Sequence, residues 1–112
     1  MIKTDVNSLL EYVSKKMKQT FGESLSDVIL FGSYARGDFD EESDVDIAIV
    51  VDISREDLKA FHKDFVKEMT DLAMKYDLVV SLIDIPLSDF NKYKEVLPFY
   101  KNISDEGVRI SA

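Results

Sequence analysis

Two short groups of residues in this sequence have the types and the spacing to act together on a ligand. Gly32 and Ser33 follow one hydrophobic stretch, and Asp44 and Asp46 open another. Glycine lets the backbone turn sharply and approach a ligand, and a helix beginning at Ser33 would direct free N–H groups at an anion. Arg36 could add a charged guanidinium fork to the same anion. The first group therefore suits the oxygens of a phosphate.

The aspartate pair suits a divalent cation. Two residues that lie two apart on a strand project from the same face, so Asp44 and Asp46 would be neighbours. Neighbouring carboxylates repel each other unless a cation lies between them. Mg²⁺ or Mn²⁺ is the natural occupant, with water and phosphate oxygens as further ligands. Each group alone is also typical of an ordinary turn or a solvated strand start. The two together predict a metal–nucleotide site.

The elements around these groups predict an α/β (α+β) fold. We expect a small mixed sheet of three to four strands with helices packed against it, in a single domain over residues 1–112. The expected elements are a helix starting at Thr4 or Asp5 and ending before Gly22, strands at 27–31, 44–51 and 77–85, a short helix from Ser33, a long helix from Ser54 to Tyr76, and one or two short helices in 87–112.

Two long helices carry apolar residues at steps of three and four, which is the spacing of a core-facing stripe. These residues are Val6, Leu9, Leu10, Val13 and Met17 in the first helix and Leu58, Phe61, Phe65, Met69, Leu72 and Tyr76 in the second. Ser54 is the expected N-cap of the second helix. This helix can serve as the crossover between two parallel strands. The run VDIAIVV within 44–51 predicts a strand that is buried on both faces.

Composition excludes several classes of function. The chain has 22 acidic and 14 basic residues, a net charge of −8, and therefore no basic stripe for extended contact with nucleic acid. A nucleotide is still compatible with this charge, because bound Mg²⁺ reverses the local sign. The absence of cysteine excludes disulfides and thiol catalysis. No apolar run approaches the ~18 residues of a membrane helix, and we expect a cytoplasmic protein that does not enter the membrane.

The fuller pattern closely resembles a known signature. From Gly32 to Asp46 the chain reads G-S-Y-A-R-G-x5-S-D-V-D, and IAIVV follows. This is similar to the signature of the DNA polymerase β-like nucleotidyltransferase superfamily, and in particular to its minimal nucleotidyltransferase (MNT) branch. The resemblance is strong over about residues 25–52 and continues more weakly over 77–110.

The resemblance implies an activity and a set of site residues. Members of the superfamily bind a nucleoside triphosphate with two Mg²⁺ ions, for which Mn²⁺ can substitute, and transfer the nucleoside monophosphate to an acceptor hydroxyl with release of pyrophosphate. By position, Gly32 and Ser33 would hold the β- and γ-phosphates. Ser43 and the guanidinium of Arg36 would also lie at the nucleotide. Asp44 and Asp46 would be the metal-binding, catalytic carboxylates.

A third carboxylate is the point at which this chain departs from the pattern. The superfamily usually supplies it from a later strand, and the aligned position here is Ser81. Asp77 lies four residues earlier and would share a face with Ser81 if the strand began there, so it is our candidate for the third catalytic residue. Asp84 would point to the other face. The remaining alternative is that this carboxylate is absent.

The resemblance also implies a partner. Minimal members are similar to the antitoxin half of a two-gene module whose other product is a small helical HEPN-domain ribonuclease toxin, and the nucleotidyltransferase can transfer AMP to a tyrosine of that toxin. We therefore expect transfer of AMP from ATP, or of another nucleoside monophosphate, to a hydroxyl of a HEPN partner. Ser81 keeps an alternative open, in which the domain is catalytically weak or inactive and neutralises its partner by binding. Self-association is compatible with both.

Overall fold

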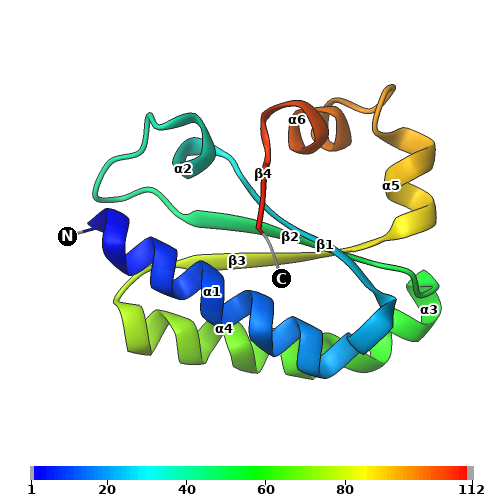
Figure 1. Cartoon of the computed structure of the whole chain (residues 1–112), viewed down its shortest axis with the longest axis horizontal. Helices are drawn as coiled ribbons and strands as arrows, with labels where there is room; N and C mark the ends of the chain where they lie inside the picture. The colour runs from blue at the N-terminus through cyan, green and yellow to red at the C-terminus, as the bar shows by residue number, and fades with distance from the viewer. Residues whose placement is uncertain (1, 111–112) are drawn as a thin grey trace.

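The computed structural model describes residues 2–110 and has helices on both faces of one sheet (Figure 1). The strands are β1 (Leu25–Phe31), β2 (Val45–Val51), β3 (Val80–Pro86) and β4 (Val108–Arg109). The α-helices are α1 (Ile2–Phe21), α2 (Ser33–Arg36), α3 (Arg55–Leu58), α4 (His62–Tyr76), α5 (Leu87–Tyr93) and α6 (Pro98–Glu106), and two 3₁₀ turns are η1 (Gly22–Ser24) and η2 (Lys59–Phe61).

The sheet is mixed and has the strand order β3-β2-β1-β4. β1 runs antiparallel to both of its neighbours, while β2 and β3 are parallel. A parallel pair needs a long crossover, and α3, η2 and α4 supply it. β2 lies inside the sheet and is covered on both faces, so every residue of Ile47–Val51 has an exposed fraction of 0%. The mixed sheet with packed helices and the buried second strand confirm the predicted fold class.

The larger core lies between the sheet and helices α1 and α4, which run along the lower face in Figure 1. Every apolar residue of the two predicted stripes is buried there or packed against it. The strand residues that face these helices are Val28, Leu30, Val45, Ile47, Ile49, Val51, Val80 and Leu82. The helical spacing of the apolar residues thus determined which face of each long helix meets the sheet.

A smaller core lies on the opposite face, beneath α5 and α6. Its buried members are Ile29, Ala48, Val50, Ile85, Phe90 and Ile103. Gly107, directly after α6, is needed for this packing because a Cβ there would overlap the Ile103 carbonyl and a methyl group of Ile29. The end of α6 therefore lies directly on β1.

Several elements differ from the prediction. β2 begins at Val45, so Asp44 lies directly before the strand and not on it, and β1 and β3 begin at Leu25 and Val80 instead of at 27 and 77. The long helix is divided, because Phe61 leaves helical geometry (φ −95°, ψ 1°) and its ring packs on Phe21 with centroids 4.7 Å apart. The first helix begins at Ile2, ahead of the predicted cap at Thr4 or Asp5. β4 is the fourth strand of a sheet expected to have three to four, but its place after α6 was not predicted, because it is only two residues long and too short for any alternating pattern to indicate it.

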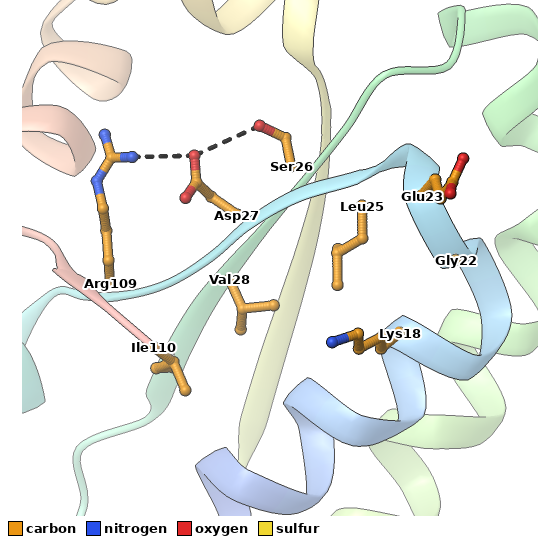
Figure 2. A pocket seen from close by; sticks show the side chains of 9 residues that line it. All are labelled: Lys18, Gly22, Glu23, Leu25, Ser26, Asp27, Val28, Arg109 and Ile110. Carbon is orange, nitrogen blue, oxygen red and sulfur yellow. Dashed lines mark hydrogen bonds and ion pairs between the residues drawn. The ribbon is translucent and has the colours of Figure 1, made fainter. Parts of the chain in front are cut away.

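The outer edge of β1 is only partly covered. β4 pairs with Ile29 and Leu30, and a register shift between Leu25 and Asp27 marks a β-bulge in the part that β4 does not reach. There Arg109 donates to Asp27 at 3.0 Å beside a hollow of about 560 Å³ (Figure 2). This hollow lies at the opposite end of β1 from the predicted metal–nucleotide site. Across residues 2–110, no helix combines the length and the apolar character that crossing a membrane requires.

Candidate active site

Three residues form a row across the sheet on the face that carries α5 and α6. Phe31 of β1 pairs with Asp46 of β2, and Asp46 pairs with Ser81 of β3. Paired residues of neighbouring strands project from the same face, and Ala48 and Val50, two and four residues beyond Asp46, belong to the smaller core. Ser81 is therefore beside Asp46, as the resemblance implied.

Gly32 and Ser33 form the turn that was predicted to bind phosphate, here called the phosphate-type turn. At Gly32 this turn lies against the carboxylate of Asp46. Gly32 has φ 76° and ψ −155°, a conformation that L side chains rarely adopt, and a Cβ there would lie 2.5 Å from Asp46 Oδ2. α2 begins at the next residue, Ser33, as predicted. The amides of Ala35 and Arg36 both donate to the Gly32 carbonyl at 3.1 Å. The amides of Ser33 and of the residue after it are the first of the helix and have no carbonyl of the preceding turn to bond to, so they are available to a ligand.

The two aspartates form an uncompensated pair. Burial, and then the charge of Asp44, raise the pKa of Asp46, while Arg36 acts in the opposite direction. Within the described residues, no lysine, arginine or histidine forms an ion pair with either carboxylate. A half-buried carboxylate next to a second one is unfavourable unless a cation neutralises the pair.

This donor set suits one divalent ion held by two carboxylates. Hard cations such as Mg²⁺ accept that arrangement when water and phosphate oxygens complete the coordination. Nowhere in residues 2–110 do three or more acidic, histidine or cysteine side chains gather as a metal-binding group. A second ion would therefore depend on ligands other than a third protein carboxylate.

Comparison with known proteins agrees with this geometry. Residues 10–110 match the family described as the nucleotidyltransferase domain. The chain belongs to the nucleotidyltransferase family. A protein of Methanocaldococcus jannaschii named "Putative protein adenylyltransferase" is 38% identical over 101 residues, which cover 89% of this chain and 91% of the relative.

Solved structures show the same fold in antitoxins. A toxin–antitoxin complex with AMP-PNP contains a chain that matches with a TM-score of 0.58 and 22% identity, over 86% of this nucleotidyltransferase and 68% of that chain. A complex of an AMP-modified HEPN toxin from Shewanella oneidensis with its MNT antitoxin matches with a TM-score of 0.53 and 18% identity, over 97% of this chain and 71% of that one. At these identities the likeness is one of fold.

Arg36 of the nucleotidyltransferase is held by two carboxylates. Its Nε donates to Asp38 Oδ2 at 3.2 Å, and its Nη1 donates to Glu106 Oε1 at 3.5 Å. The bond to Asp38, and then that to Glu106, raise the pKa of the guanidinium, which stays charged. Neither Asp38 nor Glu106 was predicted from the sequence to contact Arg36. Glu106 is 70 residues away from Arg36, and the only signal for it was the weak resemblance of the C-terminal stretch.

Ser43 organises the loop between α2 and β2. Its hydroxyl accepts a hydrogen bond from the amide of Asp40 at 2.9 Å and donates to Asp40 Oδ1 at 3.2 Å. At the other end of the loop, the rings of Tyr34 and Phe39 stack with centroids 4.3 Å apart. The loop that carries the chain from the phosphate-type turn to Asp44 is therefore tied at both ends. The predicted role of Ser43 at the nucleotide stays a prediction.

Asp77 does not lie on β3, contrary to the prediction that the strand begins there. It is the C-cap of α4 in the left-handed conformation (φ 54°), and the strand starts three residues later at Val80. A helix that must turn into a strand commonly ends with one left-handed residue, and aspartate tolerates that conformation. The carboxylate is therefore not presented from the strand beside Ser81. Asp84 is on the opposite face of β3, as predicted, where it lines a hollow with Arg55 of α3.

Proposed function

We propose that this nucleotidyltransferase transfers AMP from Mg²⁺–ATP to a hydroxyl group of a HEPN-type partner protein and acts as its antitoxin. The observation that carries the proposal is the contact between the turn at Gly32 and the carboxylate of Asp46. It joins a phosphate-binding element to a cation-binding pair. The adenylyltransferase relative and the MNT–HEPN complexes support the choice of AMP and of a protein acceptor.

The residues of the chain have separate parts in this proposal. Gly32 leaves room for the carboxylate of Asp46 close to the turn, and the amide and hydroxyl of Ser33 donate to the phosphate oxygens. Asp44 and Asp46 would hold Mg²⁺, which supplies neutralisation of the triphosphate charge and lowers the pKa of the acceptor hydroxyl. Arg36 adds a permanent positive charge near the same oxygens. Most of the catalysis is positioning and electrostatic stabilisation.

The proposed reaction is an in-line substitution at phosphorus. The acceptor oxygen forms a bond to the α-phosphorus, and the bond from that phosphorus to the oxygen bridging to the β-phosphate breaks. Pyrophosphate leaves with the bonding electron pair, and the hydroxyl proton is released to solvent. The product is a phosphodiester that links AMP to the partner.

One observation favours a second candidate function. Ser81 stands where a third carboxylate is expected, and no third acidic side chain joins Asp44 and Asp46 among the described residues. A domain of this kind that binds nucleotide but transfers it slowly would neutralise its partner by binding alone. This alternative keeps the same fold and the same partner, so activity must be measured separately from complex formation.

The test uses ATP labelled at the α-phosphate, Mg²⁺ and a candidate HEPN partner, such as a small helical protein encoded by a neighbouring gene. We expect label on the HEPN protein with the wild type and a loss of at least about 100-fold with Asp44→Ala or Asp46→Ala, which remove charge stabilisation at the transferring phosphate. Asp52→Ala, an exposed aspartate just beyond β2, is the matched control and should transfer normally. Absence of label transfer, together with a tight complex that Asp44→Ala plus Asp46→Ala leaves intact, favours the binding-only alternative.

A further inference from the structure

Glu106 has an electrostatically unfavourable position that Arg36 relieves. It is the last residue of α6, and the last turn of that helix carries no basic residue. The C-terminal end of a helix is its negative pole, so a carboxylate there is repelled by the unpaired carbonyl groups. The nearby cation is Arg36, which comes from a different part of the chain and reaches Glu106 Oε1 with its Nη1 at 3.5 Å.

Stability of the fold does not account for this contact. The side chains of Arg36 and Glu106 are 47% and 41% exposed, and ion pairs with that exposure typically contribute only about 0–1 kcal/mol. The contact has a clearer effect on the orientation of the Arg36 guanidinium than on the stability of the fold. Asp38 takes the Nε of Arg36 and Glu106 takes its Nη1, so the guanidinium is held at two points. Its Nη2 has no hydrogen bond to the described residues and stays available for a phosphate oxygen.

Glu106 is itself fixed by the packing of the next residue. The amide of Gly107 donates to the Ile103 carbonyl at 3.0 Å, and Ile103 is fully buried in the smaller core. Gly107 also lies so close to Ile29 that a Cβ would overlap its side chain. Ile29 belongs to β1, the strand that leads directly into Gly32. The helix end, the strand and the phosphate-type turn are thus joined by direct packing.

We propose that Glu106 is a positioning residue for nucleotide binding, which acts from the C-terminal helix by holding Arg36 of the α2 turn in place to receive a phosphate. This inference rests on the proposed function and assigns to a residue outside the signature a share in nucleotide affinity. It also explains why an acid is placed at the negative end of α6.

The experiment measures binding of a non-hydrolysable ATP analogue with Mg²⁺ by calorimetry. We expect Arg36→Ala and Glu106→Ala each to weaken binding about three- to ten-fold, and the double variant to be no weaker than Arg36→Ala alone, because residues that act through one contact are not additive. Glu106→Gln keeps an acceptor oxygen and should lose less. Asp105→Ala is the matched control on the same helix, since it removes an exposed carboxylate whose one ion pair within residues 2–110 is with Lys101.

The outcomes separate this inference from the proposed function. If the wild type binds the analogue and Glu106→Ala binds as tightly as Asp105→Ala, Glu106 has no positioning role, whatever its effect on the melting temperature. Additive losses in the double variant also overturn the inference. If the wild type itself does not bind the analogue with Mg²⁺, the proposed function fails. Glu106→Ser, which also removes the carboxylate, supplies the same comparison if Glu106→Ala does not fold.

Discussion

At the residue scale, Gly32 meets two separate requirements at the site. Its backbone is in a conformation that L side chains rarely adopt, and the space where a Cβ would lie is taken by Asp46 Oδ2 at 2.5 Å. Gly37 shares the first requirement, with φ 86°, but nothing lies within 4 Å of its Cβ position. Substitutions at these two glycines of the signature therefore distinguish the effect of backbone strain from the effect of displacing the Asp46 carboxylate.

Substitution of these glycines should give different results in binding. Gly37→Ala should lower the free energy of unfolding by about 1–2 kcal/mol through strain at positive φ. Gly32→Ala should cost about 1–3 kcal/mol, because its φ and ψ lie in a region essentially confined to glycine. Only Gly32→Ala should also weaken binding of Mg²⁺–nucleotide, by at least about ten-fold, because it moves Asp46. Urea unfolding and calorimetry measure the two effects. Equal affinity in the two variants would show that the contact with Asp46 is unimportant for the ligand.

Asp46 gives a prediction about pH. Burial and the charge of Asp44 raise the pKa of Asp46 in the folded protein. The contribution of Asp46 to stability is therefore fully present at pH values below its pKa in the unfolded chain, and it is lost as the pH rises through its pKa in the folded protein. At pH 7 without divalent ions, ionised Asp46 therefore destabilises the fold. Asp46→Asn should raise the melting temperature at pH 7, and the gain should vanish below about pH 4, where the unfolded carboxyl is itself protonated.

Mg²⁺ should act against the higher melting temperature expected for Asp46→Asn. Millimolar Mg²⁺ should raise the melting temperature of the wild type more than that of Asp46→Asn, since the ion binds the folded pair. Asp52→Asn, which removes an exposed aspartate, is the control. A melting temperature of Asp46→Asn that is lower than that of the wild type at pH 7 without divalent ions would contradict the prediction.

Much of the arrangement of the candidate site could be predicted from the sequence at this scale, and the reason is local. Gly32 and Ser33 directly follow β1, Asp44 directly precedes β2 and Asp46 is near its start, and neighbouring antiparallel strands bring these ends together. Glu106 was not predicted, because its contact with Arg36 depends on how α6 packs on β1, which no pattern within either segment encodes.

At the scale of elements, the register of β2 and β3 determines what Ser81 can do. Ser81 is the direct neighbour of Asp46 on the same face. Ser81→Asp would place a third carboxylate in the row. We expect this variant to be less stable than the wild type without metal and to bind Mn²⁺ more tightly, because each added carboxylate repels the pair until a cation is present.

Asp84→Asn supplies the control for that register. It lies on the same strand but on the opposite face, so it should leave Mn²⁺ affinity unchanged. Titration of Mn²⁺ followed by paramagnetic relaxation measures both variants. Tighter binding by Ser81→Asp together with weaker binding by Asp84→Asn would mean that the two faces are not separate.

The elements also show where prediction from sequence stopped. Ser54 is the N-cap that the pattern indicated, with its hydroxyl accepting from the amide of Asp57 at 3.1 Å. Asp77 was expected on a strand because apolar residues follow it, but the helix before it needed a left-handed terminal residue and used Asp77 for that purpose. An apolar run shows that a strand is near and does not fix its first residue.

At the scale of the whole molecule, one sheet supports two cores. The larger is under α1 and α4, and the smaller is under α5 and α6. β2 contributes alternate residues to both, and all of Ile47–Val51 is fully buried. Because the strands are shared, we expect the two layers to unfold together.

Two truncations of core residues test this expectation. Phe90→Ala in the smaller core should cost about 3–5 kcal/mol and Leu72→Ala in the larger core about 2–5 kcal/mol, both as a shift of one urea transition. Met74→Ala, at a residue that is 82% exposed, should change the free energy of unfolding by less than about 0.5 kcal/mol. A separate early transition for Phe90→Ala by circular dichroism would show that the α5–α6 layer melts independently.

The partly covered edge of β1 has a consequence for behaviour at high concentration. Exposed strand edges are templates on which other chains add and grow into fibrils. Here the exposed part carries a bulge, and the Arg109–Asp27 ion pair stands beside it (Figure 2). A strand added from another molecule would have to straighten the bulge and take both charges out of water. This edge is therefore a poor seed for aggregation.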